Sequence, residues 1–253
     1  MWIVSAILTL LIITVFAAAT LSKPDFGPRG CDRRRAIAEV AAIVIDRTDA
    51  LTAGQQEHLR GEVDQFCSSL PPNSLVCVFG IQNPDQGVLA TGFCRCRPED
   101  GLHTSAFIGN REQVRAAFQD SFATPLALGL ARANPLQESP TSPILEAIHE
   151  LSTVSDFADS TRPRSLCIFS DMIQNTPALS LYQRAASEEM VRDDRVSALL
   201  CNLRNVSVRV WQMERPRDAQ LQDPALETFW EAYFLNCGVH DFQYRRMPSA
   251  SIN

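Results

Sequence analysis

Two apolar stretches, each followed at once by an acidic residue, decide the fold of this chain. Ala36–Ile45 reads AIAEVAAIVI and is followed by Asp46, and Ser165–Ser170 reads SLCIFS and is followed by Asp171. Neither stretch alternates apolar and polar residues over its length, as a strand with one exposed face does. Both are therefore predicted to be strands of a parallel sheet that is buried on its two faces.

The rest of the chain supplies the helices and further strands that such a sheet needs. Apolar residues at positions 59, 63, 66 and 70 follow a helical spacing until Pro71-Pro72 ends the pattern. Strand and helix patterns then alternate, which predicts one α/β domain over residues 36–247 with a doubly wound, mostly parallel sheet of Rossmann-like type. The further predicted strands are 74–81, 88–97 (at an edge), 206–213 and 241–246, and the predicted helices are 55–70, 110–122, 144–151, 187–203 and 224–237.

The chain begins with an apolar segment. Trp2–Leu21 carries no charged residue, and its twenty residues would span about 30 Å as a helix, the thickness of a bilayer's hydrocarbon core. We predict a transmembrane anchor over residues 1–22, a basic Pro/Gly linker over 23–35 and a short tail over 248–253. A cleaved signal peptide is the alternative, because Ala17–Ala19 resembles a small-residue cleavage site.

Basic residues crowd the far side of this apolar segment. Lys23, Arg29 and Arg33–Arg35 follow it, and basic residues close to a membrane span tend to stay in the cytoplasm. We therefore predict a single-pass protein of the inner (plasma) membrane with a cytoplasmic domain, in which all eight cysteines are reduced. The alternative is an exported domain, periplasmic or secreted.

Charge and motifs exclude several classes of function. The formal net charge of −6 argues against nucleic acid as a partner. The common sequence signatures of hydrolases, nucleotide-binding proteins and zinc proteases are absent, so we predict that the protein is not an enzyme. A metal-assisted hydrolase is the less favoured alternative.

Acidic and hydroxyl side chains follow the predicted strands where ligands bind in sheets of this type. Asp46 and Thr48 follow the first strand, Asp171 follows the later one, and Ser142 precedes a predicted helix. Carboxylate and hydroxyl oxygens are ligands that Mg²⁺ prefers, so these four residues form a candidate Mg²⁺ site. Alternatively, they make only local hydrogen bonds, with Asp46 capping a turn, Ser142 capping its helix and Asp171 bonding backbone amides.

These motifs resemble those of the von Willebrand factor A domain family, in a bacterial-type, membrane-anchored form. The family has Asp-x-Ser/Thr-x-Ser after a strand, then a Thr-Pro-Leu-x-x-Ala-Leu loop, then a strand that ends in Thr/Ser-Asp-Gly. The matching segments here are Asp46-x-Thr48-x-Ala50, Ser142-Pro143-Ile144-x-x-Ala147-Ile148 and Ser170-Asp171-Met172. The resemblance covers residues 36–247.

The departures from the family pattern affect its metal-ion-dependent adhesion site. Ala50 replaces the second hydroxyl of the first motif, Met172 replaces a Gly, and Ser142 replaces a Thr unless Thr141 takes that place. The resemblance thus implies a degenerate site, to which Asp49 is an outer candidate contributor. It also implies a protein-binding or scaffolding module that recognises its partner at the carboxyl edge of the sheet, with a divalent cation as an optional participant.

Overall fold

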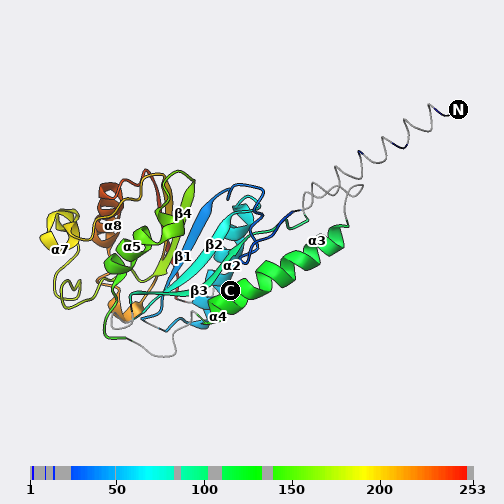
Figure 1. Ribbon diagram of the computed structural model, residues 1–253. Coiled ribbons are helices and arrows are strands. Elements are labelled where there is room, and N and C mark those ends of the chain that lie inside the picture. Colours follow the sequence, from blue (N-terminus) through cyan, green and yellow to red (C-terminus); the bar gives the residue numbers. More distant parts are fainter. Residues whose placement is uncertain are drawn as a thin grey trace.

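The computed structural model describes residues 24–48, 50–82, 87–101, 110–132 and 139–249, together with the single positions 2, 9 and 14. Within these ranges the chain folds around one six-stranded sheet with helices on both of its faces (Figure 1). The predicted α/β architecture is confirmed.

The sheet has the strand order β3-β2-β1-β4-β5-β6. All neighbouring strands run parallel except β3, which pairs antiparallel with β2 and forms one edge. This order places β1 and β4, the two strands from which the fold was predicted, side by side at the centre. The strands are β1 (Val40–Asp46), β2 (Leu75–Ile81), β3 (Leu89–Cys96), β4 (Arg164–Ser170), β5 (Val206–Met213) and β6 (Asp241–Met247).

The helices divide between the two faces of the sheet. One face is covered mainly by α5, α6 and α8, and the other by α2, η2 and α4, whereas α3, which leads into η2, extends beyond the sheet (Figure 1). The helical elements are α2 (Ala53–Ser69), α3 (Arg111–Phe118), the π-helical turn η2 (Gln119–Ala123), α4 (Thr124–Arg132), α5 (Ile144–Thr153), α6 (Ser155–Ala158), the 3₁₀ turn η3 (Glu188–Arg192), α7 (Asp194–Ser197), the 3₁₀ turn η4 (Pro216–Asp218) and α8 (Pro224–Asn236).

Strand β1 contributes to both hydrophobic cores. Val40, Ala42 and Val44 pack in the core beneath α5 and α8, whereas Ala41, Ile43 and Ile45 pack in the core beneath α2. Successive side chains of a strand point to opposite faces, so burial on two faces requires an uninterrupted apolar run. The first stretch quoted above meets this requirement from Val40 onward.

The predicted helix over 187–203 is wrong. The chain forms only the short turns η3 and α7 there, because Asp193 adopts an extended backbone between them and its carboxylate accepts a hydrogen bond from the Arg195 amide. An Asp side chain competes in this way with helix continuation. The predicted helix over 110–122 begins as expected with Asn110 as its N-cap, but it continues through η2 into α4.

Four cysteines are paired, which corrects the prediction that all eight are reduced. Disulfides join Cys31 to Cys96 and Cys77 to Cys94, whereas Cys67, Cys167, Cys201 and Cys237 are free thiols. Cys77 lies directly opposite Cys94 in the antiparallel β2–β3 ladder. The sequence does not reveal this pairing, because it depends on the strand register.

The segment before β1 is attached to the domain. The Cys31–Cys96 disulfide ties it to β3, and the Arg29 guanidinium forms an ion pair with the Asp156 carboxylate at 2.5 Å. Within the described parts of the chain, no helix is long and apolar enough to cross a membrane. The predicted anchor over 1–22 lies outside the described residues apart from positions 2, 9 and 14.

We expect peptide mapping after acid quenching and alkylation to find Cys31, Cys77, Cys94 and Cys96 protected until a reductant is added. The other four cysteines should react once the chain is denatured; before that, Cys67 should react slowly, because burial raises the pKa of its thiol to about 12. Replacing Cys31 and Cys96 by Ser opens a loop that spans 65 residues and should lower the free energy of unfolding by about 2–5 kcal/mol. Eight thiols that alkylate without reductant would contradict the pairing.

Candidate functional site

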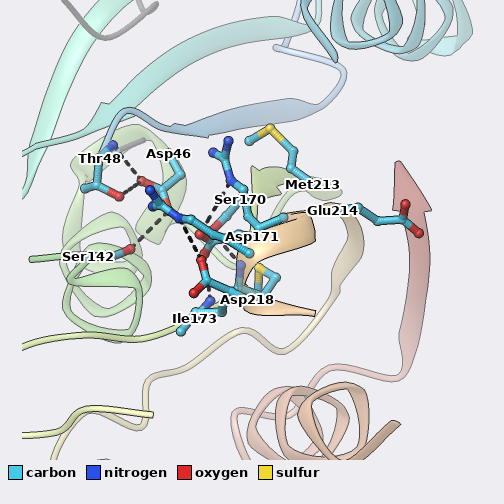
Figure 2. A network of polar contacts seen from close by, with 12 residues as sticks. Asp46, Thr48, Ser142, Ser170, Asp171, Ile173, Met213, Glu214 and Asp218 are labelled. Atoms are coloured by element: carbon cyan, nitrogen blue, oxygen red, sulfur yellow. Dashed lines mark hydrogen bonds and ion pairs between the residues drawn. The ribbon is translucent and has the colours of Figure 1, made fainter. Parts of the chain in front are cut away.

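The candidate site lies at the carboxyl ends of the two central strands. Asp46 is the last residue of β1, Ser170 is the last residue of β4, and Asp171 follows it directly (Figure 2). Ser142 reaches the same place from the loop before α5, where its backbone exchanges two hydrogen bonds with Asn175 at 2.7 and 2.9 Å. The sheet order thus brings together residues that are 96 and 124 positions apart in the sequence.

The Asp46 carboxylate is the centre of a buried hydrogen-bond network. Its Oδ1 accepts from the Thr48 backbone amide at 2.9 Å and from the Thr48 hydroxyl at 2.6 Å. Its Oδ2 accepts from the Ser170 hydroxyl at 2.7 Å and from the Ser142 hydroxyl at 3.1 Å. Because only 3% of Asp46 is exposed, these four donors replace the water that this carboxylate loses on folding.

Asp171 has a different environment. Its Oδ1 accepts from the Ile173 amide at 2.8 Å, and its Oδ2 lies 3.8 Å from Nε of Arg215. Both side chains are largely buried, with 3% of the Asp171 side chain and 11% of the Arg215 side chain exposed. A cationic guanidinium therefore faces the second carboxylate of the site.

Arg215 is held in place by two buried glutamines. The Gln222 side chain accepts from the Arg215 amide at 2.7 Å and donates to the carbonyls of Asp171 at 3.0 Å and Met213 at 2.9 Å. Gln55, from the first turn of α2, donates to the carbonyl of Glu214 at 3.0 Å. The loop after β5 is thus fixed against both β4 and α2.

Met172 takes the place at which the resembled family has Gly, and its backbone lies in the left-handed region with φ of 63°. Two hydrogen bonds hold this conformation: the Met172 amide donates to the Ser170 hydroxyl at 2.9 Å, and its carbonyl accepts from the Trp230 indole at 2.8 Å. The Met172 side chain is fully buried in the core beneath α5 and α8. Burial of this side chain offsets the backbone strain.

A pocket of about 190 Å³ opens beside this network. Its lining is mostly hydroxyl, amide and charged side chains, and it includes Thr48, Ser142 and Asp171 but not Asp46. The other lining residues are Ser139, Pro140, Thr141, Ile173, Asn175, Tyr182 and Arg217. The three predicted site residues in the wall are therefore the ones that a ligand in the pocket can touch.

The four predicted metal ligands lie together, but their arrangement does not fit a six-coordinate Mg²⁺ ion. Each Asp46 oxygen already accepts two hydrogen bonds. Ala50 has no side-chain oxygen, and its carbonyl accepts from Nη1 of Arg215 at 2.7 Å. The Arg215 guanidinium also faces Asp171, so this carboxylate already has a positively charged neighbour that a metal ion would have to tolerate.

The local hydrogen bonds that are the alternative to a metal site are found for Asp46 and Asp171 but not for Ser142. Asp46 and Asp171 do accept hydrogen bonds from backbone amides two residues further on. Ser142 does not cap α5: its hydroxyl bonds to Asp46, and the α5 amide of Leu145 donates instead to the Gln174 side chain at 2.9 Å. Ser142 rather than Thr141 thus occupies the hydroxyl position beside Asp46.

Sequence reasoning missed several residues of the site. Arg215 and Asp218, from the polar segment after β5, are largely buried although no motif marks them. Ser170 was named only as part of the third motif, and Gln55 and Gln222 were not predicted to take part. A Gln in the first turn of a helix usually signals capping, and Gln55 does form a capping box with Thr52, so its second contact leaves no trace in the sequence. Asp49 lies outside the described residues.

Three of the solved structures that are similar to this chain illustrate its fold. BatB from Bacteroides thetaiotaomicron, a conserved hypothetical protein, is 12% identical with a TM-score of 0.46 and covers 83% of this chain and 91% of its own. A von Willebrand factor type A protein from Catenulispora acidiphila is 10% identical with a TM-score of 0.36, covering 80% of this chain and 42% of its own. An aerotolerance-related membrane protein from Bacteroides fragilis NCTC 9343 is 9% identical with a TM-score of 0.37, covering 82% and 90%.

No protein-family model matches the chain, and no curated protein does. The class is therefore defined by the molecule's own features: the strand order, the single antiparallel edge strand and the three motifs that meet at the ends of β1 and β4. The chain is an α/β domain with a Rossmann-like sheet, and its three motifs resemble those of the von Willebrand factor A family.

We expect Ser170→Ala to lower the free energy of unfolding by about 1–3 kcal/mol, because it removes one donor to buried Asp46 and the acceptor of the Met172 amide. Urea unfolding measures this difference. Ser207→Ala on the exposed face of β5 is the matched control and should change the value by less than about 0.5 kcal/mol. Equal effects of the two substitutions would contradict the network.

At position 172 we expect Gly to give a more stable protein than Ala, the reverse of their usual order inside helices and strands. Met172→Ala should cost about 2–5 kcal/mol through the cavity that it leaves. Met172→Gly makes a similar cavity but removes the left-handed strain, so this variant should be about 1 kcal/mol more stable than Met172→Ala. A Gly variant less stable than the Ala variant in urea unfolding would show that position 172 is unstrained.

Proposed function

We propose that this protein is a membrane-anchored, protein-binding or scaffolding module that recognises a partner at the carboxyl edge of its sheet. The observation that carries the proposal is the pocket beside the Asp46 network. Hydroxyl, amide, carboxylate and guanidinium groups from four loops converge on it, and parallel sheets bind their ligands at this edge.

A binding role is proposed in preference to catalysis. The described side chains that line the pocket include no histidine and no cysteine to act as base or nucleophile. Among the described residues of the wall, Asp171 is the carboxylate; it faces Arg215, and its Oδ1 is engaged by the Ile173 amide. Such a carboxylate serves better to orient a ligand than to accept a proton from it. Mg²⁺ dependence, which the sequence predicts, is not required by this proposal.

The membrane attachment is proposed from the apolar segment Trp2–Leu21, which is long enough to cross a bilayer as a helix. Two features bear in opposite directions on the side that the domain faces. Lys23, Arg29 and Arg33–Arg35 favour the cytoplasm, whereas the two disulfides favour an oxidising compartment. We propose the exported side, because disulfides persist where no cytosolic reductant reaches them.

A photocrosslinking amino acid placed at position 182 tests the binding role. Tyr182 lines the pocket and is 46% exposed, so a probe there lies within reach of a bound partner. We expect a discrete protein adduct in intact cells, and we expect Arg217→Ala, which removes a cation from the same wall, to weaken that adduct severalfold. The matched control is the same probe at Leu235, which is 52% exposed on α8 and is not part of the pocket wall.

The absence of an adduct at position 182, or the same adducts from both positions, would refute recognition at this edge.

The side of the membrane is tested separately with C-terminal reporters. An exported domain should activate a reporter that works only outside the cytoplasm and leave a cytosol-only reporter inactive. The reverse pattern would support the cytoplasmic placement predicted from the basic residues.

A further inference from the structure

The candidate site carries two buried carboxylates whose surroundings are unequal. Asp46 and Asp171 are 3% and 2% exposed. Neutral donors satisfy both oxygens of Asp46, whereas Asp171 accepts from the Ile173 amide at Oδ1 and faces the Arg215 guanidinium at Oδ2. Buried carboxylates are costly without a compensating charge, so a cation at this place contributes strongly to the folded state.

Arg215 supplies that cation between two of the three family-like motifs. Its Nη1 donates to the Ala50 carbonyl at 2.7 Å, and its Nε lies 3.8 Å from Oδ2 of Asp171. Ala50 is the position at which the resembled family has its second hydroxyl. The guanidinium therefore contacts the first motif at Ala50, where the hydroxyl of the family pattern is absent, and the third motif at Asp171.

The position of this guanidinium is fixed by the backbone that carries it. Gln222 binds the Arg215 amide and the Asp171 carbonyl, and Gln55 binds the Glu214 carbonyl. Most of the Arg215 side chain is enclosed, with 11% exposed, although its hydrogen bond to the Ala50 carbonyl lies at the surface. Its buried Nε has no hydrogen-bond partner among the described residues, so the arginine acts on Asp171 through its charge.

We propose that Arg215 takes the place of the divalent cation in this von Willebrand factor A-like site, as a fixed internal positive charge that makes the site metal-independent. Two features of the site are then linked: Ala50 lacks the hydroxyl that would bind a metal ion, and Arg215, which contacts the Ala50 carbonyl, supplies the positive charge instead. This inference concerns the charge of the site and stands whether or not the pocket binds a protein.

Thermal unfolding of the full chain in detergent, followed by tryptophan fluorescence with and without millimolar Mg²⁺ or Mn²⁺, tests the proposal. The wild type should show the same melting temperature in metal and in chelator. Arg215→Met keeps the length of the side chain but removes its charge, and it should lower the melting temperature by several degrees. Arg115→Met, at an exposed position on α3, is the control and should change it little.

A second pair of variants asks whether these two features are linked. Arg215→Lys keeps the charge and should recover much of the loss without creating a response to metal. Arg215→Met combined with Ala50→Ser restores a hydroxyl and removes the internal cation, and it should gain a saturable rise in melting temperature with Mg²⁺ or Mn²⁺. Asp171→Asn added to this pair should abolish the rise.

Three results would overturn the proposal: a saturable response of the wild type to metal, an Arg215→Met variant as stable as the wild type, or an Arg215→Lys variant no more stable than Arg215→Met. If Arg215→Met does not fold, calorimetric titration of the wild type with Mg²⁺ still decides, since measurable binding contradicts metal independence. None of these measurements involves a partner, so their failure is distinct from a failure of the crosslinking experiment.

Discussion

The arrangement of this domain depends on the hydrogen bonds that converge on the Asp46 carboxylate. Donors from the loop after β1, from the loop before α5 and from the end of β4 meet on its two oxygens. A buried carboxylate keeps its charge at acceptable cost only if such donors are all present, so each of these segments is fixed relative to the others. The same contacts hold one wall of the pocket, since Thr48 and Ser142 belong to both.

The second half of the site is organised around charge. Asp171 follows β4 directly, and the guanidinium that faces it comes from the loop after β5, the neighbouring strand. Gln222 joins the two loops through three hydrogen bonds. Trp230, fully buried on α8, extends this connection to the helix layer by donating to the Met172 carbonyl. The polar site is thus supported from below by the aromatic core, which leaves it little freedom to rearrange.

The other end of the domain is stabilised by covalent bonds. The Cys31–Cys96 and Cys77–Cys94 disulfides join the segment before β1 to edge strand β3 and join β3 to β2. An edge strand pairs on one side only, so cross-links there restrict the part of a sheet that opens most readily. They also connect the folded domain to the residues that follow the apolar N-terminal segment.

The sequence by itself determined the sheet, its two central strands and the residues at their ends. Apolar runs such as AAIVI specify burial on two faces, and an acid after each run marks the carboxyl edge, because both signals are local. Only the tertiary structure decided what those acids contact. Nothing in the local sequence pairs Arg215 with Asp171 or Cys77 with Cys94. Strand order brings the first pair together, and strand register brings the second. Such contacts join residues far apart in the chain, and pairing across that distance is set by packing rather than by any local pattern.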